Sequence, residues 1–186
     1  MACPSPLLAP GHDVFRVNAA GTFNVFEAAA VCGIKRVVQA SSINALGCFY
    51  GIDELYPQYF PVTEAHPTRT TDPYSFSKQV VEEIGDYYWR RDGISSVAMR
   101  FPGVYSAGFA QREGFQQKRE RMTQLYDALA ALPPNELTAR ITEAQTAALQ
   151  FRAERPLEFD PENPQTTFKA IDDPLVAAYV YDRYNF

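Results

Sequence analysis

RVVQASS, residues 36–42, and DPYSFSK, residues 72–78, are the two stretches of sequence that decide the fold of this chain. The first has two valines at its centre and predicts a short buried β-strand over residues 36–40. The second places Pro73 at the first position of a helix, behind a capping residue at position 71 or 72. Apolar residues at helical spacing carry that helix to about Arg91, so a strand is followed by a helix.

Elements of the same two kinds lie on either side of these stretches. Apolar spacing predicts a helix over residues 13–31, ended by Gly33, and a second strand over residues 94–100. Residues 47–71 hold glycine, prolines and aromatic residues and are expected to form a long loop. The order helix, strand, helix, strand is typical of parallel α/β construction. We therefore expect an α/β fold with a parallel sheet, of which this chain contributes about two strands.

The last third of the chain differs in composition. Residues 110–154 are rich in Gln, Glu, Arg, Ala and Leu and predict two helices separated by the pair Pro133-Pro134. A short helix is expected around residues 175–181, within a stretch rich in proline and aromatic residues. We expect residues 1–109 to form the α/β core and residues 110–186 a helical and irregular segment.

Charge, cysteines and hydropathy exclude several classes of protein. A net charge of −5 and a pI near 5.1 argue against a surface for nucleic acid, which requires clustered cations. The three cysteines and two histidines show no spacing typical of disulfides or metal sites, so no metal is expected. No apolar run approaches the ~20 residues of a membrane helix, and residues 1–11 lack the features of a signal peptide. A cytoplasmic protein with no membrane partner is expected.

Tyr74 and Lys78 suggest the chemistry. Residues four apart on a helix lie on the same face, so the phenol and the ammonium can act on one bound molecule. A free tyrosine loses its proton near pH ~10, and a neighbouring cation lowers that pKa, which would let Tyr74 act as an acid or base at neutral pH. The alternative interpretation is a half-buried tyrosine on an amphipathic helix, with a solvated lysine beside it.

Four motifs in a fixed order resemble one family. Residues 17–25, VNAAGTFNV, are similar to the V-N-x-x-G-T-x-N-V stretch of the extended short-chain dehydrogenases/reductases, the NAD-dependent sugar epimerase/dehydratase group. Residues 37–42 resemble that family's strand ending in a catalytic serine or threonine. Residues 74–78 resemble its Y-x-x-x-K, and residues 100–105 its R-x-x-x-V-Y. The resemblance covers roughly residues 13–105 and implies part of a Rossmann-like, doubly wound parallel sheet with flanking helices.

The resemblance also implies roles for individual residues. Ser42 would orient the substrate hydroxyl or carbonyl, Tyr74 would move the proton, and Lys78 would hold the ribose hydroxyls of the cofactor. Asn18 would support the site, although an amide that satisfies buried backbone is an equally good interpretation. The catalytic residues would be Ser42, Tyr74 and Lys78, and the cofactor would contact Ser41, Tyr74, Lys78, Phe101, Pro102, Gly103 and Val104.

Several features of the family are absent from these residues. A dinucleotide fold opens with a strand and a glycine-rich turn, but the ten glycines include no G-x-G-x-x-G spacing. Gly103 stands where the family usually has asparagine. We therefore expect this chain to correspond to the central piece of a longer protein. Whether it acts as an enzyme or survives as a catalytically inactive binding or interaction module stays open at this point.

The resemblance indicates the substrate and the cofactor only as classes of compound. The cofactor would be NAD or NADP, and the substrate a sugar, a nucleotide sugar or a sugar-derived compound. Epimerisation, dehydration and simple alcohol oxidation all remain open. Glu64 would be either an acid in the substrate pocket or, more simply, a surface carboxylate. Family members often dimerise through two helices, which implies a homodimer through residues 13–31 and 72–91.

Overall fold

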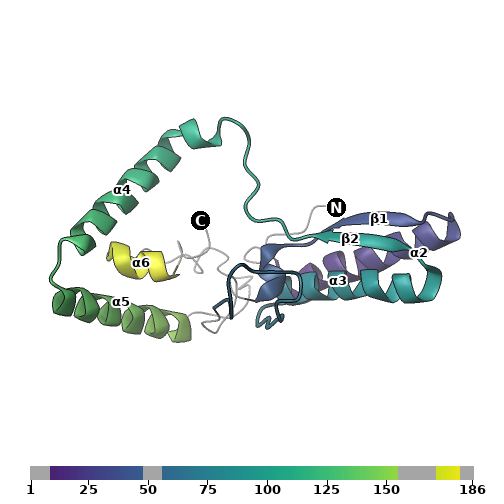
Figure 1. Cartoon of the computed structure of the whole chain (residues 1–186), viewed down its shortest axis with the longest axis horizontal. Coiled ribbons are helices and arrows are strands. Elements are labelled where there is room, and N and C mark those ends of the chain that lie inside the picture. The colour runs from purple at the N-terminus through teal and green to yellow at the C-terminus, as the bar shows by residue number, and fades with distance from the viewer. Residues whose placement is uncertain (1–8, 48–55, 155–170, 181–186) are drawn as a thin grey trace. The chain divides into compact units, whose positions relative to one another are not determined.

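The computed structural model describes residues 9–47, 56–154 and 171–180 (Figure 1). The chain divides into two compact units. The first contains the described residues up to 102, and the second contains residues 103–154 and 171–180. Within the described ranges, no helix combines the length and the apolar character that a membrane crossing requires.

The first unit alternates helices and strands as the sequence predicts. A continuous helical segment runs from α1 (Gly11–Phe15) through a π-helical stretch (Arg16–Ala20) into α2 (Gly21–Val31). The strand β1 (Arg36–Ala40), a short 3-10 helix (Ile43–Leu46), the helix α3 (Pro73–Asp92) and the strand β2 (Ser95–Met99) follow. The predicted first strand and α3 are confirmed to within a residue.

The two strands form a parallel sheet of two neighbours. Arg36 pairs with Ser95 at one end and Ala40 with Met99 at the other. The helix α3 connects them, as a parallel pair requires, and both α2 and α3 lie on one side of the sheet (Figure 1). The expected α/β class, part of a Rossmann-like parallel sheet, is confirmed.

An aromatic core joins the helices to that side of the sheet. Phe26, Ala29, Ile84, Tyr88 and Ile94 are buried together, and the rings of Phe26 and Tyr88 stack with centroids 5.0 Å apart. Burial of each large side chain contributes about 1.5–3 kcal/mol.

Alternate strand residues point away from this core. Val38, Val97 and Met99 are 67%, 48% and 42% exposed, as the period of two in a strand dictates. The opposite face of the sheet is therefore apolar and open among the described residues.

Glycines and a cap fix the ends of the helices. Asp72 has extended backbone, and its Oδ1 accepts from the amide of Ser75 at 2.8 Å, so the capping residue is Asp72. Gly93 ends α3 with a φ of +65°, and Gly33 follows α2 with a φ of +69°. Left-handed backbone of this kind costs glycine little, because glycine has no Cβ.

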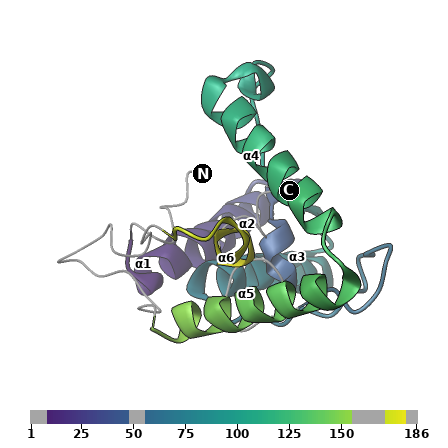
Figure 2. The same cartoon turned by 90° about the vertical axis from the view of Figure 1, so that its left-hand side faces the viewer.

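The second unit is helical. It contains a 3-10 turn (Phe109–Gln111), α4 (Glu113–Ala130), α5 (Pro134–Glu154) and α6 (Pro174–Val180). Both predicted helices and the short third one are confirmed. In both views α6 lies alongside α5 (Figures 1 and 2). Ala144 and Ala148 of α5 pack against Leu175, Val176 and Val180 of α6.

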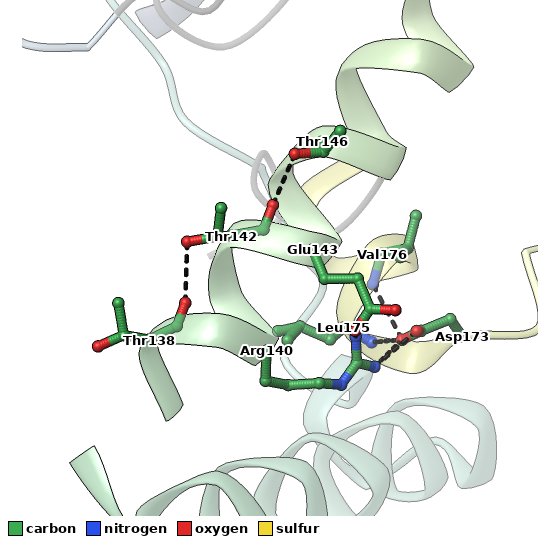
Figure 3. A network of polar contacts seen from close by, with 8 residues as sticks. All are labelled: Thr138, Arg140, Thr142, Glu143, Thr146, Asp173, Leu175 and Val176. Carbon is green, nitrogen blue, oxygen red and sulfur yellow. Dashed lines mark hydrogen bonds and ion pairs between the residues drawn. The ribbon is translucent and has the colours of Figure 1, made fainter. Parts of the chain in front are cut away.

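A polar network fastens the start of α6 to α5 (Figure 3). The Nη2 atom of Arg140 donates to both carboxylate oxygens of Asp173, at 2.7 and 2.5 Å. The same carboxylate accepts from the amides of Leu175 and Val176, at 2.9 and 3.3 Å, and so caps α6. Burial raises the pKa of Asp173, but the hydrogen bonds from Arg140 and these amides outweigh it and lower that pKa. Asp173 is thereby held in its charged form.

Candidate active site

Tyr74 and Lys78 occupy the first two turns of α3. The Lys78 side chain is buried, with the residue 8% exposed. Its Nζ lies 5.7 Å from the centroid of the Tyr74 ring and donates to the carbonyl oxygen of Ala40 at 2.9 Å. Burial of an ammonium is costly unless polar or aromatic groups surround it. Lys78 therefore connects the face of α3 that carries Tyr74 to the last residue of β1.

Two serines follow β1, and their hydroxyls have different partners. Both residues are buried, at 4% for Ser41 and 7% for Ser42. The Oγ of Ser42 accepts from the amide of Asn44 at 3.2 Å and caps the 3-10 helix. The Oγ of Ser41 donates to Oε1 of Glu82 at 2.5 Å. Ser41 thus binds α3, whereas Ser42 begins the turn that leaves the sheet.

Asn18 supports the first turn of α3 from the neighbouring helix. It is buried within the π-helical stretch, and its Nδ2 donates to Oγ of Ser77 at 2.8 Å. The Ser77 hydroxyl in turn donates to the carbonyl of Tyr74 at 2.7 Å. The sequence predicted a helix over residues 13–31 and did not predict the π-helical stretch within it. Such wide turns often occur at functional sites.

The segment after β2 begins beside the turn that follows β1. The amide of Ile43 donates to the carbonyl of Phe101 at 3.0 Å, which joins the carboxyl ends of the two strands. Phe101 is 42% exposed and Val104 79% exposed. A Cβ added at Gly103 would lie 2.7 Å from Cζ of Tyr105, so a side chain there would force that ring to move.

Sequence reasoning missed an ion pair at the same end of the sheet. Glu82 accepts from Nε of Arg100 at 3.0 Å and from Nη2 at 2.8 Å, with the two side chains 20% and 23% exposed. The hydrogen bond to Glu82 raises the pKa of Arg100, against the effect of burial. Glu82 stands four residues after Lys78, and this continued spacing was the one available signal.

The described part of the loop before α3 folds around a buried histidine. Nε2 of His66 accepts from the amide of Gln58 at 2.9 Å, so the neutral ring carries its proton on Nδ1 and donates it to the carbonyl of Pro67 at 2.9 Å. The loop is tied to the 3-10 helix by the bond from the Arg69 amide to the Leu46 carbonyl, at 3.1 Å. Glu64 is exposed, which favours its interpretation as a surface carboxylate. Residues 48–55 of the predicted loop lie outside the described residues.

These contacts converge at the carboxyl ends of β1 and β2 and the first half of α3. In open α/β sheets, ligands bind at this edge. The arrangement places a phenol one turn from a buried ammonium, with a serine hydroxyl at the end of the adjoining strand. Groups of these types can move a proton to or from a substrate oxygen.

Comparison with known proteins identifies the family of this chain. The model of the NAD dependent epimerase/dehydratase family matches residues 8–138. Uronate dehydrogenase of Pseudomonas syringae pv. tomato is 35% identical over 92 residues, which are 49% of this chain and 30% of that protein. UDP-glucose 4-epimerase of Mus musculus is 40% identical over 73 residues, which are 39% of this chain and 19% of that protein. This chain therefore spans less than a third of the length of these relatives.

A solved structure supports the assignment at the level of the fold. The crystal structure of a UDP-galactose 4-epimerase has a TM-score of 0.50 and 26% identity, over 64% of this chain and 39% of that one. The family match extends over more than half of the chain and includes all the residues that converge at the sheet edge. The chain belongs to the NAD dependent epimerase/dehydratase family.

Proposed function

We propose that this chain carries the acid/base residues of an NAD(P)-dependent oxidoreductase, epimerase or dehydratase. Its substrate would be a sugar, a nucleotide sugar or a sugar-derived compound. The position of Lys78 carries the proposal, because its ammonium is buried between the Tyr74 ring and the last carbonyl of β1. A solvated lysine beside a structural tyrosine, the alternative interpretation of this pair, would not be buried in this way.

Each of three residues has a part in the proposed reaction. Tyr74 takes the proton from a substrate hydroxyl, or returns it to a carbonyl. The Lys78 ammonium stabilises the phenolate, because an opposite charge nearby favours the ionised form. Ser42 accepts from the Asn44 amide, and since a hydroxyl has one donor besides its lone pairs, its O–H can donate to the substrate oxygen.

The residues present fit the nicotinamide end of a dinucleotide. Phe101 is exposed just after β2, and the Lys78 ammonium lies at the carboxyl end of β1, where its N–H groups would donate to a ribose hydroxyl. Ser41, Tyr74 and residues 101–104 complete the proposed contacts. When bound, NAD or NADP supplies or accepts the hydride at the substrate carbon.

Cofactor binding and Tyr74→Phe test the proposal. Titration with NAD and NADP should raise the free energy of unfolding by about 2.7 kcal/mol at a hundred times the dissociation constant. Tyr74→Phe should leave the far-UV circular dichroism unchanged and lower turnover by about 10²–10⁴-fold. Tyr126→Phe is the matched control, since Tyr126 is an exposed tyrosine of α4. Full turnover by the Tyr74→Phe protein would refute the assignment.

A second candidate function is a catalytically inactive module that binds another protein. The observation that favours it is the apolar face formed by Val38, Val97 and Met99, which is exposed in the described structure. This hypothesis predicts no stabilisation by either dinucleotide. It also predicts that Val38→Lys weakens capture of a protein partner without changing dinucleotide binding. The same titration with NAD and NADP therefore separates the two candidates.

We further propose a homodimer through the helical segments at residues 13–31 and 72–91. Phe23 and Val25 of α2 and Phe76 and Tyr87 of α3 are 38–47% exposed, and such residues are suited to a contact between copies. Sedimentation equilibrium should give twice the monomer mass, and Val25→Glu should return the protein to monomers. A monomeric wild type at micromolar concentration would contradict the proposal.

Two assignments accompany this function. Residues 1–109 would be the catalytic core and residues 110–186 the substrate side. The protein would work in the cytoplasm, where Cys32, an exposed free cysteine, stays reduced.

A further inference from the structure

Three residues of α3 form a row with a spacing of four. Tyr74, Lys78 and Glu82 follow one another by about one turn each, so they share a face of the helix. The proposed reaction uses the first two. The hydrogen bonds described for Glu82 go to Ser41, which follows β1, and to Arg100, which follows β2.

Both oxygens of the Glu82 carboxylate are engaged. Oε1 accepts from the Ser41 hydroxyl at 2.5 Å and from Nε of Arg100 at 3.0 Å, while Oε2 accepts from Nη2 of Arg100 at 2.8 Å. Paired bonds between guanidinium and carboxylate fix the orientation of both groups. Because both side chains are mostly buried, solvent screens this pair less than it screens an exposed one.

These bonds close a ring that contains Ser42. From Glu82 the ring passes through the hydrogen bond to Ser41 and along the chain through residues 42 and 43. It continues through the bond from the Ile43 amide to the Phe101 carbonyl and returns through Arg100 to Glu82. The bond from Lys78 to Ala40 braces the same corner. Ser42 is thereby held from both sides.

We propose that Glu82 is a positioning residue that holds Ser42 and the start of the 101–104 segment in register with Tyr74 and Lys78. The inference rests on the proposed function, because it assigns Glu82 to the support of that site. Glu82 acts through Ser41 and Arg100 and takes no part in the chemistry itself. Its removal loosens the turn after β1 while the sheet and α3 stay folded.

Glu82→Gln is the decisive variant, with Glu83→Gln as its control. Glutamine keeps one acceptor oxygen, but an NH2 group with two donors replaces the other carboxylate oxygen, so the two paired bonds from Arg100 cannot both form. Glu83 is the adjacent carboxylate and is exposed. Ser41→Ala removes a single hydroxyl from the ring and provides a second test if Glu82→Gln does not fold.

Hydrogen exchange of the chain as it exists reports the predicted loosening. In Glu82→Gln, the amides of Ile43 and Asn44 should exchange at least about tenfold faster, which corresponds to about 1.4 kcal/mol, while the amides of the β1–β2 ladder keep their rates. Ser41→Ala should raise the exchange rates of the same two amides by a smaller factor. A uniform increase over all amides, or rates equal to those of Glu83→Gln, would overturn the inference.

Turnover and cofactor binding separate this inference from the proposed function. In the active protein, Glu82→Gln should lower kcat about tenfold with KM within about twofold of wild type, since the substrate still binds but is misaligned. An unchanged kcat would overturn the inference even if exchange changed. If the wild type bound neither NAD nor NADP, the proposed function would fail, and the exchange of Ile43 and Asn44 would still decide whether Glu82 positions this turn.

Discussion

The hydroxyl of Tyr88 is predicted to stabilise the pairing of α2 with α3, and Tyr88→Phe tests this with little other change. The Tyr88 ring is fully buried, stacks on Phe26 and lies 4.4 Å from the guanidinium carbon of Arg91. Phenylalanine can keep all of these ring contacts. The hydrogen bond from the Tyr88 hydroxyl to the Glu27 carboxylate is lost, together with the longer contact of the same hydroxyl with the Phe23 carbonyl at 3.5 Å.

The expected loss of stability follows from the surroundings of Glu27. A hydrogen bond to a charged group contributes about 1.5–3 kcal/mol to stability. The Glu27 side chain is 43% exposed and keeps its ion pair with Arg91 at 2.6 Å, so water can replace the lost donor. We therefore expect Tyr88→Phe to lower the free energy of unfolding by about 1–1.5 kcal/mol, whereas Tyr88→Ala should cost about 3–5 kcal/mol because the ring is removed as well.

The hydrogen bond between Tyr88 and Glu27 also makes the loss of stability in Tyr88→Phe depend on pH, with a sign that can be predicted. Burial and the hydrogen bond to Glu27 raise the pKa of Tyr88 to about 12, from the ordinary value of 10.0 for a tyrosine. A group whose pKa is raised by folding contributes stability below its unfolded pKa and loses that contribution as pH rises through the folded one. The difference between wild type and Tyr88→Phe should therefore be complete below pH 10 and shrink as the pH approaches 12.

Urea denaturation followed by circular dichroism measures these values. Tyr87→Phe is the control, because the Tyr87 hydroxyl is 3.4 Å from Nη1 of Arg91 and lies on the exposed side. Glu27→Ala, Tyr88→Phe and the double variant complete a thermodynamic cycle, because alanine removes the acceptor. If the two single effects add within about 0.3 kcal/mol, or if Tyr88→Phe has the same stability as Tyr87→Phe, the reasoning is refuted.

Three further predictions concern turns and caps. Gly47→Ala should destabilise the first unit by more than about 2 kcal/mol, since a Cβ there would overlap a backbone carbonyl of the opposing loop and φ is +83°; Gly33→Ala, at a φ of +69° with open space around it, should cost only about 1–2 kcal/mol in the same urea titration. Asp72→Ala should remove the cap of α3 and cost about 1 kcal/mol, and equal stability of this variant and wild type would contradict the assigned cap. Acidification should release α6 from α5 when Asp173 becomes protonated. Because the pKa of Asp173 is lowered in the folded state, this should happen at a pH below the ordinary pKa of an aspartate. Arg140→Gln should move that transition to higher pH in a circular dichroism titration, and an unchanged midpoint would argue against the pairing.

The parts of the fold that the sequence predicted are those set by neighbours along the chain. The strand over residues 36–40 follows from its two valines, and the start of α3 follows from Pro73 behind a capping residue at position 71 or 72, which the structure identifies as Asp72. The closeness of Lys78 to the Tyr74 ring likewise needs only the helical repeat. Each of these features depends on residues no more than a few positions apart, where spacing determines geometry.

Contacts between elements could not be predicted in the same way. The π-helical stretch brings Asn18 to Ser77, 59 positions later, and no pattern within the helix signals that partner. The pairing of Glu82 with Ser41 and Arg100 likewise depends on how α3 crosses from β1 to β2. Such contacts form only when the strands have paired. The sequence therefore shows which residues are able to form hydrogen bonds or ion pairs, but not which residues they bind.

The row Tyr74, Lys78 and Glu82 places the proposed chemistry and its proposed support on one helix. Tyr74 lies in the first turn of α3, and Lys78, one turn later, lies near the Tyr74 ring and donates to the last residue of β1. Glu82 lies one further turn along α3 and binds the segments that follow both strands. A helix that connects two parallel strands begins near the carboxyl end of the first strand. Residues four apart on that helix lie on one face, each about one turn further along the helix axis. The first two positions are recognisable from sequence because they act on each other. The spacing places the third on the same face, but its proposed role follows from its contacts with Ser41 and Arg100. A substitution at Glu82 should therefore alter the site without altering the motif by which it is found.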